Sequence, residues 1–236
     1  MAVLSHKTAC LKEVQKMASA VIVAAGMGKR MGAGMNKAYL MLGGKTILEN
    51  TVSVFEKCKI IEEIIVVTDD TEKCKEILKG FKKVTAVVLG GKTRQDSVKN
   101  GLCAASGEFV AIHDGARALI CENDIERVVC EAKMYGAAAL GVKCKDTLKI
   151  ADENGFIMET ADRNFIYQIQ TPQVFKRTEI EKAHETAIGE FTDDCAVMEA
   201  FGKRIKIVEG SYENIKITTP EDLIIAEKIL EKRNGK

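Results

Sequence analysis

The chain has 236 residues, of which 46% are hydrophobic and 29% charged, a composition typical of a soluble globular protein. Its 35 basic and 34 acidic side chains nearly cancel, which argues against a general nucleic-acid binder and against a protein held at a membrane surface by charge. No apolar run approaches the roughly 20 residues of a membrane-spanning helix. Residues 1–16 lack the apolar core of a signal peptide.

The eight cysteines form no C-x-x-C pair, and most have apolar neighbours in the sequence, as Cys103 has in Leu102 and Ala104. This pattern favours buried, reduced thiols over a disulfide framework or a zinc site. We therefore expect a cytoplasmic protein.

Apolar runs of strand length alternate with segments of helical periodicity along the first part of the chain. The run Ile64–Val67 is apolar at every position, so we expect helices on both faces of the sheet. The alternation predicts an α/β fold with a mainly parallel sheet. Strands are expected at Ala20–Ala25, Glu63–Thr68, Thr85–Leu89, Phe109–His113 and Ala137–Val142, and helices at Ile47–Lys57, Asp70–Leu78, Gln95–Ala105 and Asn123–Tyr135.

Residues 143–170 break this alternation and predict a β-hairpin arm, with a turn at Ala151–Gly155. A lone hairpin is marginally stable in water, so it either lies on the body or packs against a second copy as a dimer.

Beyond the arm, we expect a strand pair at Arg204–Glu209 and Ile215–Ile217, and a last helix opening at Thr219 and Pro220. The chain then forms one domain, residues 20–236, after an extension of residues 1–19.

A glycine-rich loop follows the first expected strand. Gly26 and Gly28 let the backbone approach a ligand, while Arg30 and Lys37 add positive charge, as a polyphosphate site needs. The dinucleotide fingerprint fails because the third glycine comes one residue late, at Gly32, and both Gly-Lys-Thr segments lack the leading glycine of a Walker loop. The alternative is an ordinary strand-to-helix turn with solvated cations.

Two further clusters follow expected strands, where open α/β sheets bind ligands. Gly90 and Gly91 are placed to approach a base or ribose, with Ser97 near the start of the next helix; a turn with a helix cap is the alternative. Asp114 is a candidate Mg²⁺ ligand beside nucleotide phosphates, or else a turn cap.

We expect none of the three histidines to carry the chemistry of the site. We expect His113 to pack or orient rather than titrate. His6 and His184 have no candidate groups near them in the sequence, and we expect both at the surface.

Taken together, these motifs resemble the 2-C-methyl-D-erythritol 4-phosphate cytidylyltransferase family of the non-mevalonate isoprenoid pathway, from about Ala20 to the C-terminus. The resemblance implies a Rossmann-like nucleotidyltransferase fold with a protruding β-hairpin arm. The motifs in this order are Ala24-Ala25-Gly26…Arg30…Lys37, Gly90-Gly91…Arg94…Ser97, His113-Asp114-Gly115-Ala116-Arg117, Asp146-Thr147, Asp162-Arg163, Thr171-Pro172-Gln173, Thr192-Asp193 and Val208-Glu209-Gly210…Asn214-Ile215-Lys216.

The resemblance also implies roles for individual residues. Arg30 and Lys37 would stabilise charge on the α-phosphate, Asp114 would lie at Mg²⁺, and Arg163 and Lys216 would position the methylerythritol phosphate and add catalytic charge. CTP would bind at Ala24, Ala25, Gly26, Gly28, Gly90, Gly91, Ser97, Asp114 and Arg117, and the acceptor would also meet Thr147, Thr171 and Thr192.

In the family the arm crosses to a second subunit, so Thr147 and Arg163 would complete the active site of the partner in a homodimer. Two alternatives stay open. The acceptor could be another polyol phosphate such as ribitol 5-phosphate, or the chain could be a catalytically silent nucleotide-binding regulator on the same fold.

Overall fold

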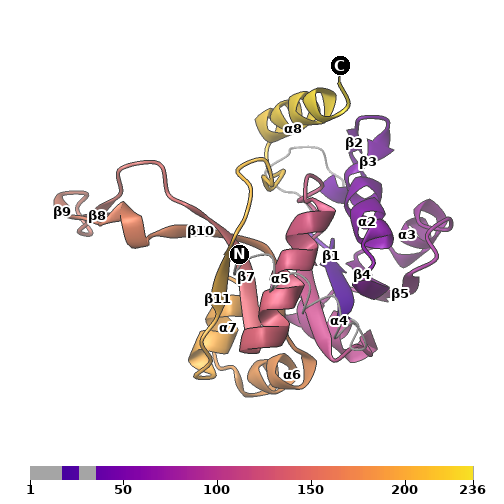
Figure 1. Cartoon of the computed structure of the whole chain (residues 1–236), viewed down its shortest axis with the longest axis horizontal. Helices are drawn as coiled ribbons and strands as arrows, with labels where there is room; N and C mark the ends of the chain where they lie inside the picture. Colours follow the sequence, from indigo (N-terminus) through magenta and orange to yellow (C-terminus); the bar gives the residue numbers. More distant parts are fainter. Residues whose placement is uncertain (1–17, 27–35, 236) are drawn as a thin grey trace, which may run out of the picture.

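The computed structural model describes residues 18–26 and 36–235, and its centre is a seven-stranded mixed sheet (Figure 1). The strand order is β11-β7-β10-β6-β1-β4-β5; β10 runs antiparallel to both of its neighbours, and the other pairs are parallel. The strands are β1 (Ala18–Val23), β4 (Ile61–Thr68), β5 (Val84–Leu89), β6 (Phe109–Asp114), β7 (Ala137–Lys143), β10 (Tyr167–Lys176) and β11 (Lys206–Glu209).

The register brings several polar strand ends to one edge of the sheet. Val23 at the end of β1 lies opposite Val67 of β4 and Asp114 of β6. Strand β10 enters beside them, because the backbone N–H of Asp114 donates to the Thr171 hydroxyl at 3.0 Å. Carboxyl ends of parallel strands are where such folds bind ligands.

Helices cover both faces of the sheet, as the all-apolar strands predicted. Alternate residues of β1 serve the two faces: Ile22 belongs to one core cluster and Val21 to the other. The first cluster includes α2 (Ile47–Lys57) and α5 (Glu122–Tyr135); the second includes α4 (Arg94–Ala104), α6 (Arg177–Thr186) and α7 (Asp194–Ala200).

Two further helices complete the described fold. Helix α3 (Thr71–Ile77) follows β4 and contacts β5 at the sheet edge. Helix α8 (Pro220–Arg233) packs through Ala226 and Leu223 against Leu42 and Ile47, near the small hairpin of β2 (Met41–Leu42) and β3 (Lys45–Thr46). The helix begins at the predicted residues: Thr219 and Asp222 form a capping box, and Pro220 is the first helical residue.

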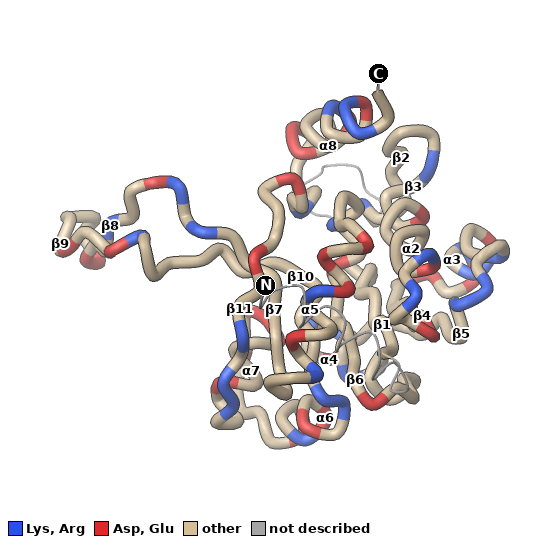
Figure 2. Tube along the Cα trace, viewed as in Figure 1, with Lys and Arg blue, Asp and Glu red and all other residues tan. Residues whose placement is uncertain are grey.

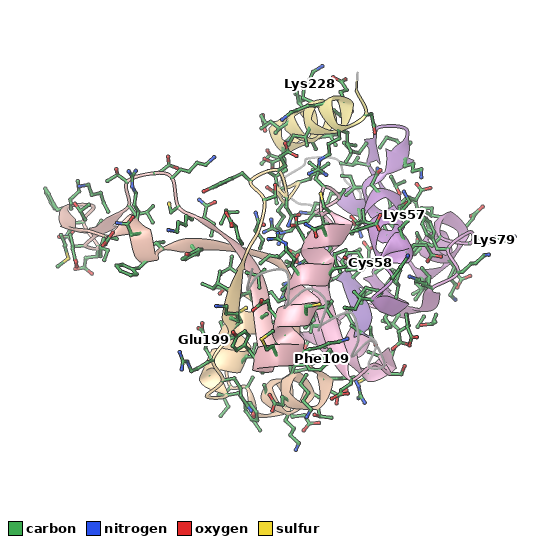
Figure 3. All side chains as sticks on the ribbon, viewed as in Figure 1. Lys57, Cys58, Lys79, Phe109, Glu199 and Lys228 are labelled. Atoms are coloured by element: carbon green, nitrogen blue, oxygen red, sulfur yellow. The ribbon has the colours of Figure 1, made fainter. Side chains whose placement is uncertain are left out.

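The predicted arm projects from the body as an extended hairpin (Figure 1). Its strands are β8 (Lys149–Ala151) and β9 (Ile157–Thr160), joined by a turn ending at Gly155, where φ is +84°. Figure 3 shows the side chains of this tip standing clear of the rest of the molecule. Its large apolar side chains, including Phe156, Ile157 and Met158, are exposed.

The structure corrects parts of the predicted element list. Ile215–Ile217 is not a strand; it is an irregular segment whose Ile217 N–H bonds to the carbonyl of Ala116. Strand β10 and helices α6 and α7 were missed. Pro172, which follows a cis peptide bond, removes a ladder donor inside β10, so that stretch does not read as a strand from sequence.

The cysteines follow the prediction only in part. Cys58, Cys74, Cys144 and Cys195 are buried free thiols. Cys103 is exposed, because on α4 its neighbour Leu102 takes the inward position. Cys130 is disulfide-bonded, contrary to the expectation of reduced thiols throughout.

Helices α2 to α6 and α8 each carry charged residues of both signs, in keeping with the near-neutral balance of the sequence (Figure 2). Within residues 18–26 and 36–235, no helix is long and apolar enough to cross a bilayer.

Candidate active site

A cavity of about 600 Å³ lies at the carboxyl ends of β1, β4 and β6. The backbone of the first loop, one turn after β5, and charged side chains from five separate segments meet there. The lining residues are Val23, Ala24, Ala25, Gly26, Asn36, Lys37, Ala38, Asp69, Gly91, Lys92, Thr93, Arg94, Ser97, Asp114, Ala116 and Lys216.

The first loop is held at both described ends by Asn36. The two hydrogens of its side-chain amide reach the carbonyl of Ala24 and Oδ1 of Asp69, each at 2.6 Å. This buried clamp fixes where the backbone of Ala24 lies beside the cavity. Sequence reasoning missed Asn36 and Asp69. The predicted contacts Gly28 and Arg30 lie outside the described residues.

The second predicted turn packs tightly against the first loop. A Cβ added to Gly90 would lie 2.3 Å from Cβ of Ala25, so a glycine is required for this approach. The backbone N–H of Gly91 donates to the Ser97 hydroxyl at 3.0 Å, and that hydroxyl donates to the carbonyl of Thr93. Ser97 therefore orders the turn as well as lining the cavity.

Asp114 is the centre of charge in the site. Its carboxylate meets Nζ of Lys216 at 2.7 Å, Nε of Arg94 at 3.6 Å and Nε of Arg117 at 3.7 Å. Burial by itself would raise the pKa of Asp114, but these cations hold the pKa well below its usual range, so the group is ionised.

Arg94 joins Asp114 to a second buried carboxylate, Asp194, whose Oδ2 lies 2.8 Å from the guanidinium. Burial opposes the charge on Arg94, but the two carboxylates outweigh it and raise its pKa. In the sequence, Arg94 stands within a family motif but has no predicted role of its own. An arginine next to a helix-capping threonine reads as a solvated side chain, and the contact depends on a segment 100 residues away.

Asp194 also accepts a hydrogen bond from Nε2 of His184 at 3.1 Å. His184 is 1% exposed, so the expectation that it lies at the surface is wrong. No polar residue near it in sequence signals this contact; α6 and α7 bring the two side chains together only in the folded chain.

His113 packs and orients, as expected. Its ring lies 4.9 Å from that of Phe55, and its two nitrogens contact the Thr171 hydroxyl and the carbonyl of Arg117. Burial lowers its pKa to about 4, so it is neutral at pH 7. Arg117 and Thr171 lie behind Asp114 and do not line the cavity.

The irregular segment before α8 carries Lys216 to the cavity. Its path is fixed by the Arg117 guanidinium, which donates to the carbonyl of Asn214 at 2.8 Å, and by Nζ of Lys37, which donates to the carbonyl of Ile217 at 2.9 Å. Lys37 and Lys216 thus approach the same side of the cavity from distant parts of the sequence.

Besides Thr171, three more of the predicted acceptor contacts do not line this cavity. Thr147 and Arg163 lie exposed on the arm, and Arg163 donates to the carbonyl of Lys145 at 2.8 Å. Thr192 is exposed beside Asp193, the residue that caps α7. No described residue of the arm lines the cavity, and the arm projects away from the body of the molecule (Figure 1).

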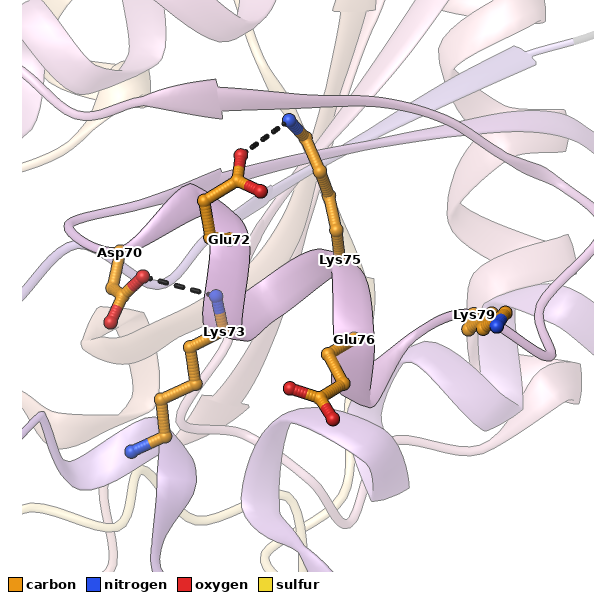
Figure 4. Close-up of a pocket in the computed structure, with 6 residues that line it drawn as sticks. All are labelled: Asp70, Glu72, Lys73, Lys75, Glu76 and Lys79. Carbon is orange, nitrogen blue, oxygen red and sulfur yellow. Dashed lines mark hydrogen bonds and ion pairs between the residues drawn. The ribbon is translucent and has the colours of Figure 1, made fainter.

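A second hollow lies on the surface of α3 and lacks the features of a binding site (Figure 4). Its lining comes from a single short helix and its cap, and Lys75 already pairs with Glu72 at 2.8 Å. It contains none of the converging strand ends that form the first cavity.

Comparison with known proteins identifies the family. Residues 18–232 match the family model described as 2-C-methyl-D-erythritol 4-phosphate cytidylyltransferase. The chain belongs to this family. Proteins of that name from Caldanaerobacter subterraneus and Desulforamulus reducens are each 48% identical, covering 91% of this chain and 99% and 96% of their own lengths.

Solved structures of the family have the same fold. The 4-diphosphocytidyl-2C-methyl-D-erythritol synthase of Anaerococcus prevotii is 34% identical, with a TM-score of 0.84 over 94% of this chain and 99% of its own. The Thermus thermophilus 2-C-methyl-D-erythritol 4-phosphate cytidylyltransferase is 32% identical, with a TM-score of 0.73 over 90% of this chain and 98% of its own. The predicted α/β nucleotidyltransferase fold and family are thereby confirmed.

Proposed function

We propose that this chain transfers the cytidylyl group of CTP to 2-C-methyl-D-erythritol 4-phosphate, giving 4-diphosphocytidyl-2-C-methyl-D-erythritol and pyrophosphate. Membership of the family supports this reaction. The observation that carries it is a cavity lined by loop backbone and by the cations Lys37, Arg94 and Lys216, in which Arg94 and Lys216 pair with a buried carboxylate, Asp114.

The reaction brings two polyanions together, so charge neutralisation and positioning dominate catalysis. An oxygen of the acceptor phosphate attacks the α-phosphorus of CTP. The new P–O bond forms as the bond to the bridging oxygen breaks, and pyrophosphate leaves with the electron pair. No side chain needs to remove a proton, because the attacking phosphate oxygen is already anionic.

We assign the CTP phosphates to the backbone of Ala24, Ala25 and Gly26, with Gly91 and Ser97 on the opposite wall. The placement of these residues around the cavity supports the assignment. Lys37 and Arg30 are assigned to the charge that develops at the α-phosphate, and Lys216 to the acceptor phosphate.

The residues at the site fit a divalent cation. Asp114 is an ionised carboxylate facing a cavity sized for a nucleotide, and Mg²⁺ takes one or two carboxylates with substrate phosphates and water. Among the described residues there is no cluster of three or more metal-binding side chains, which suits a cation shared with the nucleotide. Bound there, Mg²⁺ would neutralise phosphate charge.

We assign to the arm the formation of a homodimer. Its apolar side chains Phe156, Ile157, Met158 and Phe165 are 65–83% exposed, and a hairpin of this size needs a surface to pack on. An arm seated on a second subunit would place Thr147 and Arg163 at the cavity of that subunit, as the resemblance implies. We also assign the enzyme to the cytoplasm.

The direct test measures pyrophosphate release with CTP, Mg²⁺ and each polyol phosphate. We expect turnover with the methylerythritol phosphate. Exclusive use of ribitol 5-phosphate would instead support another cytidylyltransferase of the same fold. Binding of CTP without pyrophosphate release from any acceptor would support the silent regulator.

A further inference from the structure

A chain of buried charged and polar groups leads from the cavity into the layer of helices behind it. It runs from Asp114 to Arg94, then to Asp194, and ends at His184. The successive distances are 3.6, 2.8 and 3.1 Å. The four groups come from β6, α4, α7 and α6, so the chain exists only in the folded protein.

Burying these charged and polar groups costs free energy, because the residues packed around them are apolar. Helices α6 and α7 pack through apolar residues such as Ile180, Ala183 and Val197. Asp194 and His184 are 0% and 1% exposed, and Nδ1 of His184 has no hydrogen-bond partner within the described part of the chain. Buried ionic groups stabilise a fold less than well-packed apolar residues of similar volume often do, so packing alone does not explain them.

Arg94 and Asp114 are the members of this chain that line the cavity. A carboxylate on each side, from Asp114 and from Asp194, holds the Arg94 guanidinium in one position at the cavity wall. Without Asp194, Asp114 would be its remaining carboxylate partner among those described, and Arg94 would move toward it.

The start of α7 is itself fixed from the sheet. The side-chain oxygen of Gln173 on β10 accepts the backbone N–H groups of Asp194 and Cys195, and its nitrogen donates to Asp193 at 2.8 Å. Gln173 therefore holds the backbone of Asp194, and His184 holds its carboxylate. This arrangement preorganises the partner of Arg94 before any ligand binds.

We propose that Asp194 and His184 are positioning residues for the transfer reaction, acting through Arg94. Asp194 anchors the Arg94 guanidinium beside the reacting phosphates, and His184 orients the Asp194 carboxylate. The inference rests on the proposed function. It adds a role for two residues that do not line the cavity.

The first experiment compares Asp194→Asn with the wild type in pyrophosphate release, CTP calorimetry and thermal unfolding. We expect kcat to fall about 10- to 100-fold, as with other groups that orient a first contact, while the KM and calorimetric Kd of CTP change about threefold or less. Asp124→Asn is the matched control, because Asp124 is a buried carboxylate paired with Arg127 on α5, away from the cavity. The control should keep wild-type kcat.

A second comparison changes His184, the last group in this chain of charged and polar side chains. His184→Leu removes the donor to Asp194 and should lower kcat about tenfold, whereas His184→Gln restores a donor and should stay within about threefold of the wild type. Glu181→Gln, which breaks the Arg177 pair on the same helix α6, is the control. These variants decide the question if Asp194→Asn does not fold.

A double-mutant cycle tests the route through Arg94. In an Arg94→Gln background, Asp194→Asn should lower kcat by less than about twofold further, because the group it positions is gone. The proposal is overturned if the two effects multiply, if folded Asp194→Asn and His184→Leu keep wild-type kcat, or if His184→Gln is as impaired as His184→Leu. A wild type that releases no pyrophosphate would instead contradict the proposed function.

Discussion

Nζ of Lys216 lies 2.7 Å from Oδ2 of Asp114, so the lysine assigned to the acceptor phosphate is held by the carboxylate assigned to the metal. Without ligand, the two groups neutralise each other at the edge of the cavity. Arg94 and Arg117 stay within 3.6 and 3.7 Å of the same carboxylate, which keeps it compensated when Lys216 turns to a phosphate.

Lys216→Met should therefore give a folded enzyme with a low rate. Two guanidinium groups still compensate Asp114, so the thermal midpoint should stay near that of the wild type. Loss of one cation from the reacting centre should lower kcat about 10²- to 10³-fold. Pyrophosphate release and circular dichroism measure the two quantities; a wild-type kcat would remove Lys216 from the mechanism.

Lys37→Ala and Arg30→Ala should each lower kcat by about 10²- to 10³-fold while the protein stays folded. The expected cause is lost stabilisation of charge at the α-phosphate. Steady-state kinetics with saturating CTP measures the effect. Lys92→Ala, a lysine on the cavity wall with no assigned role, provides the comparison. An unchanged rate in either variant would contradict that residue's role.

Gly90→Ala should weaken CTP binding, because the added methyl would lie 2.3 Å from Cβ of Ala25 and 3.1 Å from Oγ of Ser97. The turn and the first loop must then move apart, and we expect a CTP Kd raised about tenfold or more, measured by calorimetry. Gly80→Ala is the matched control, since a Cβ there meets no atom within 4 Å. Equal CTP affinity in both variants would argue against a rigid turn at Gly90.

Arg163→Ala should raise the KM of the acceptor more than that of CTP. Mixing Arg163→Ala and Lys216→Met chains, at an acceptor concentration where each variant alone is slow, tests whether the arm serves the partner. Each mixed dimer then holds one site with both cations intact, so random exchange should restore about a quarter of wild-type activity. No recovery in a mixture shown by mass spectrometry to contain mixed dimers would place Arg163 and Lys216 in sites of the same chain, or outside the site.

The buried His113 predicts how stability depends on pH. Burial lowers its pKa from 6.5 to about 4, so between these pH values the unfolded chain binds a proton at this ring and the folded chain does not. The contribution of His113 to the free energy of unfolding has its full value above about pH 6.5. It decreases as the pH falls toward 4, by at most about 3 kcal/mol. Urea unfolding from pH 4 to 7 measures it, and a His113→Asn variant should show a shallower slope there. Asp114, whose pKa is also lowered, contributes stability that is full above its unfolded pKa of 3.8 and is lost only as the pH falls below that value.

Local sequence signals predicted the first half of the fold well. Helix Ile47–Lys57 occurs with the predicted bounds, since its threonine cap and apolar spacing are local signals. The later elements were harder. Strand β10 contains Pro172. The segment Ile215–Ile217 has the apolar-polar alternation of a strand, but Arg117 and Lys37 bond to its backbone and to that of Asn214 just before it, in place of a neighbouring strand. Such tertiary contacts override local preference.

The residues of the site also fall into two groups, those that the sequence could identify and those that it could not. The glycines, Lys37, Asp114 and Lys216 could be found because strand ends and family motifs mark them. Arg94 and His184 could not be assigned, because a charged residue after a cap and a histidine in a polar helix look solvated in sequence. Folding buried His184 beside Asp194 and aimed Arg94 at Asp114.

By itself the sequence determined the alternation of strands and helices, the polar strand ends and the family, because these depend on residues close together in the chain. Only the tertiary structure decided which charges meet. Asp114, Arg94, Asp194 and Lys216 lie on separate elements, and their partners follow from strand order and helix packing, which place distant carboxylates and cations within 2.7 to 3.6 Å of each other. An ion pair requires two charges within a few ångströms in space, and the separation of two residues along the sequence does not predict that distance.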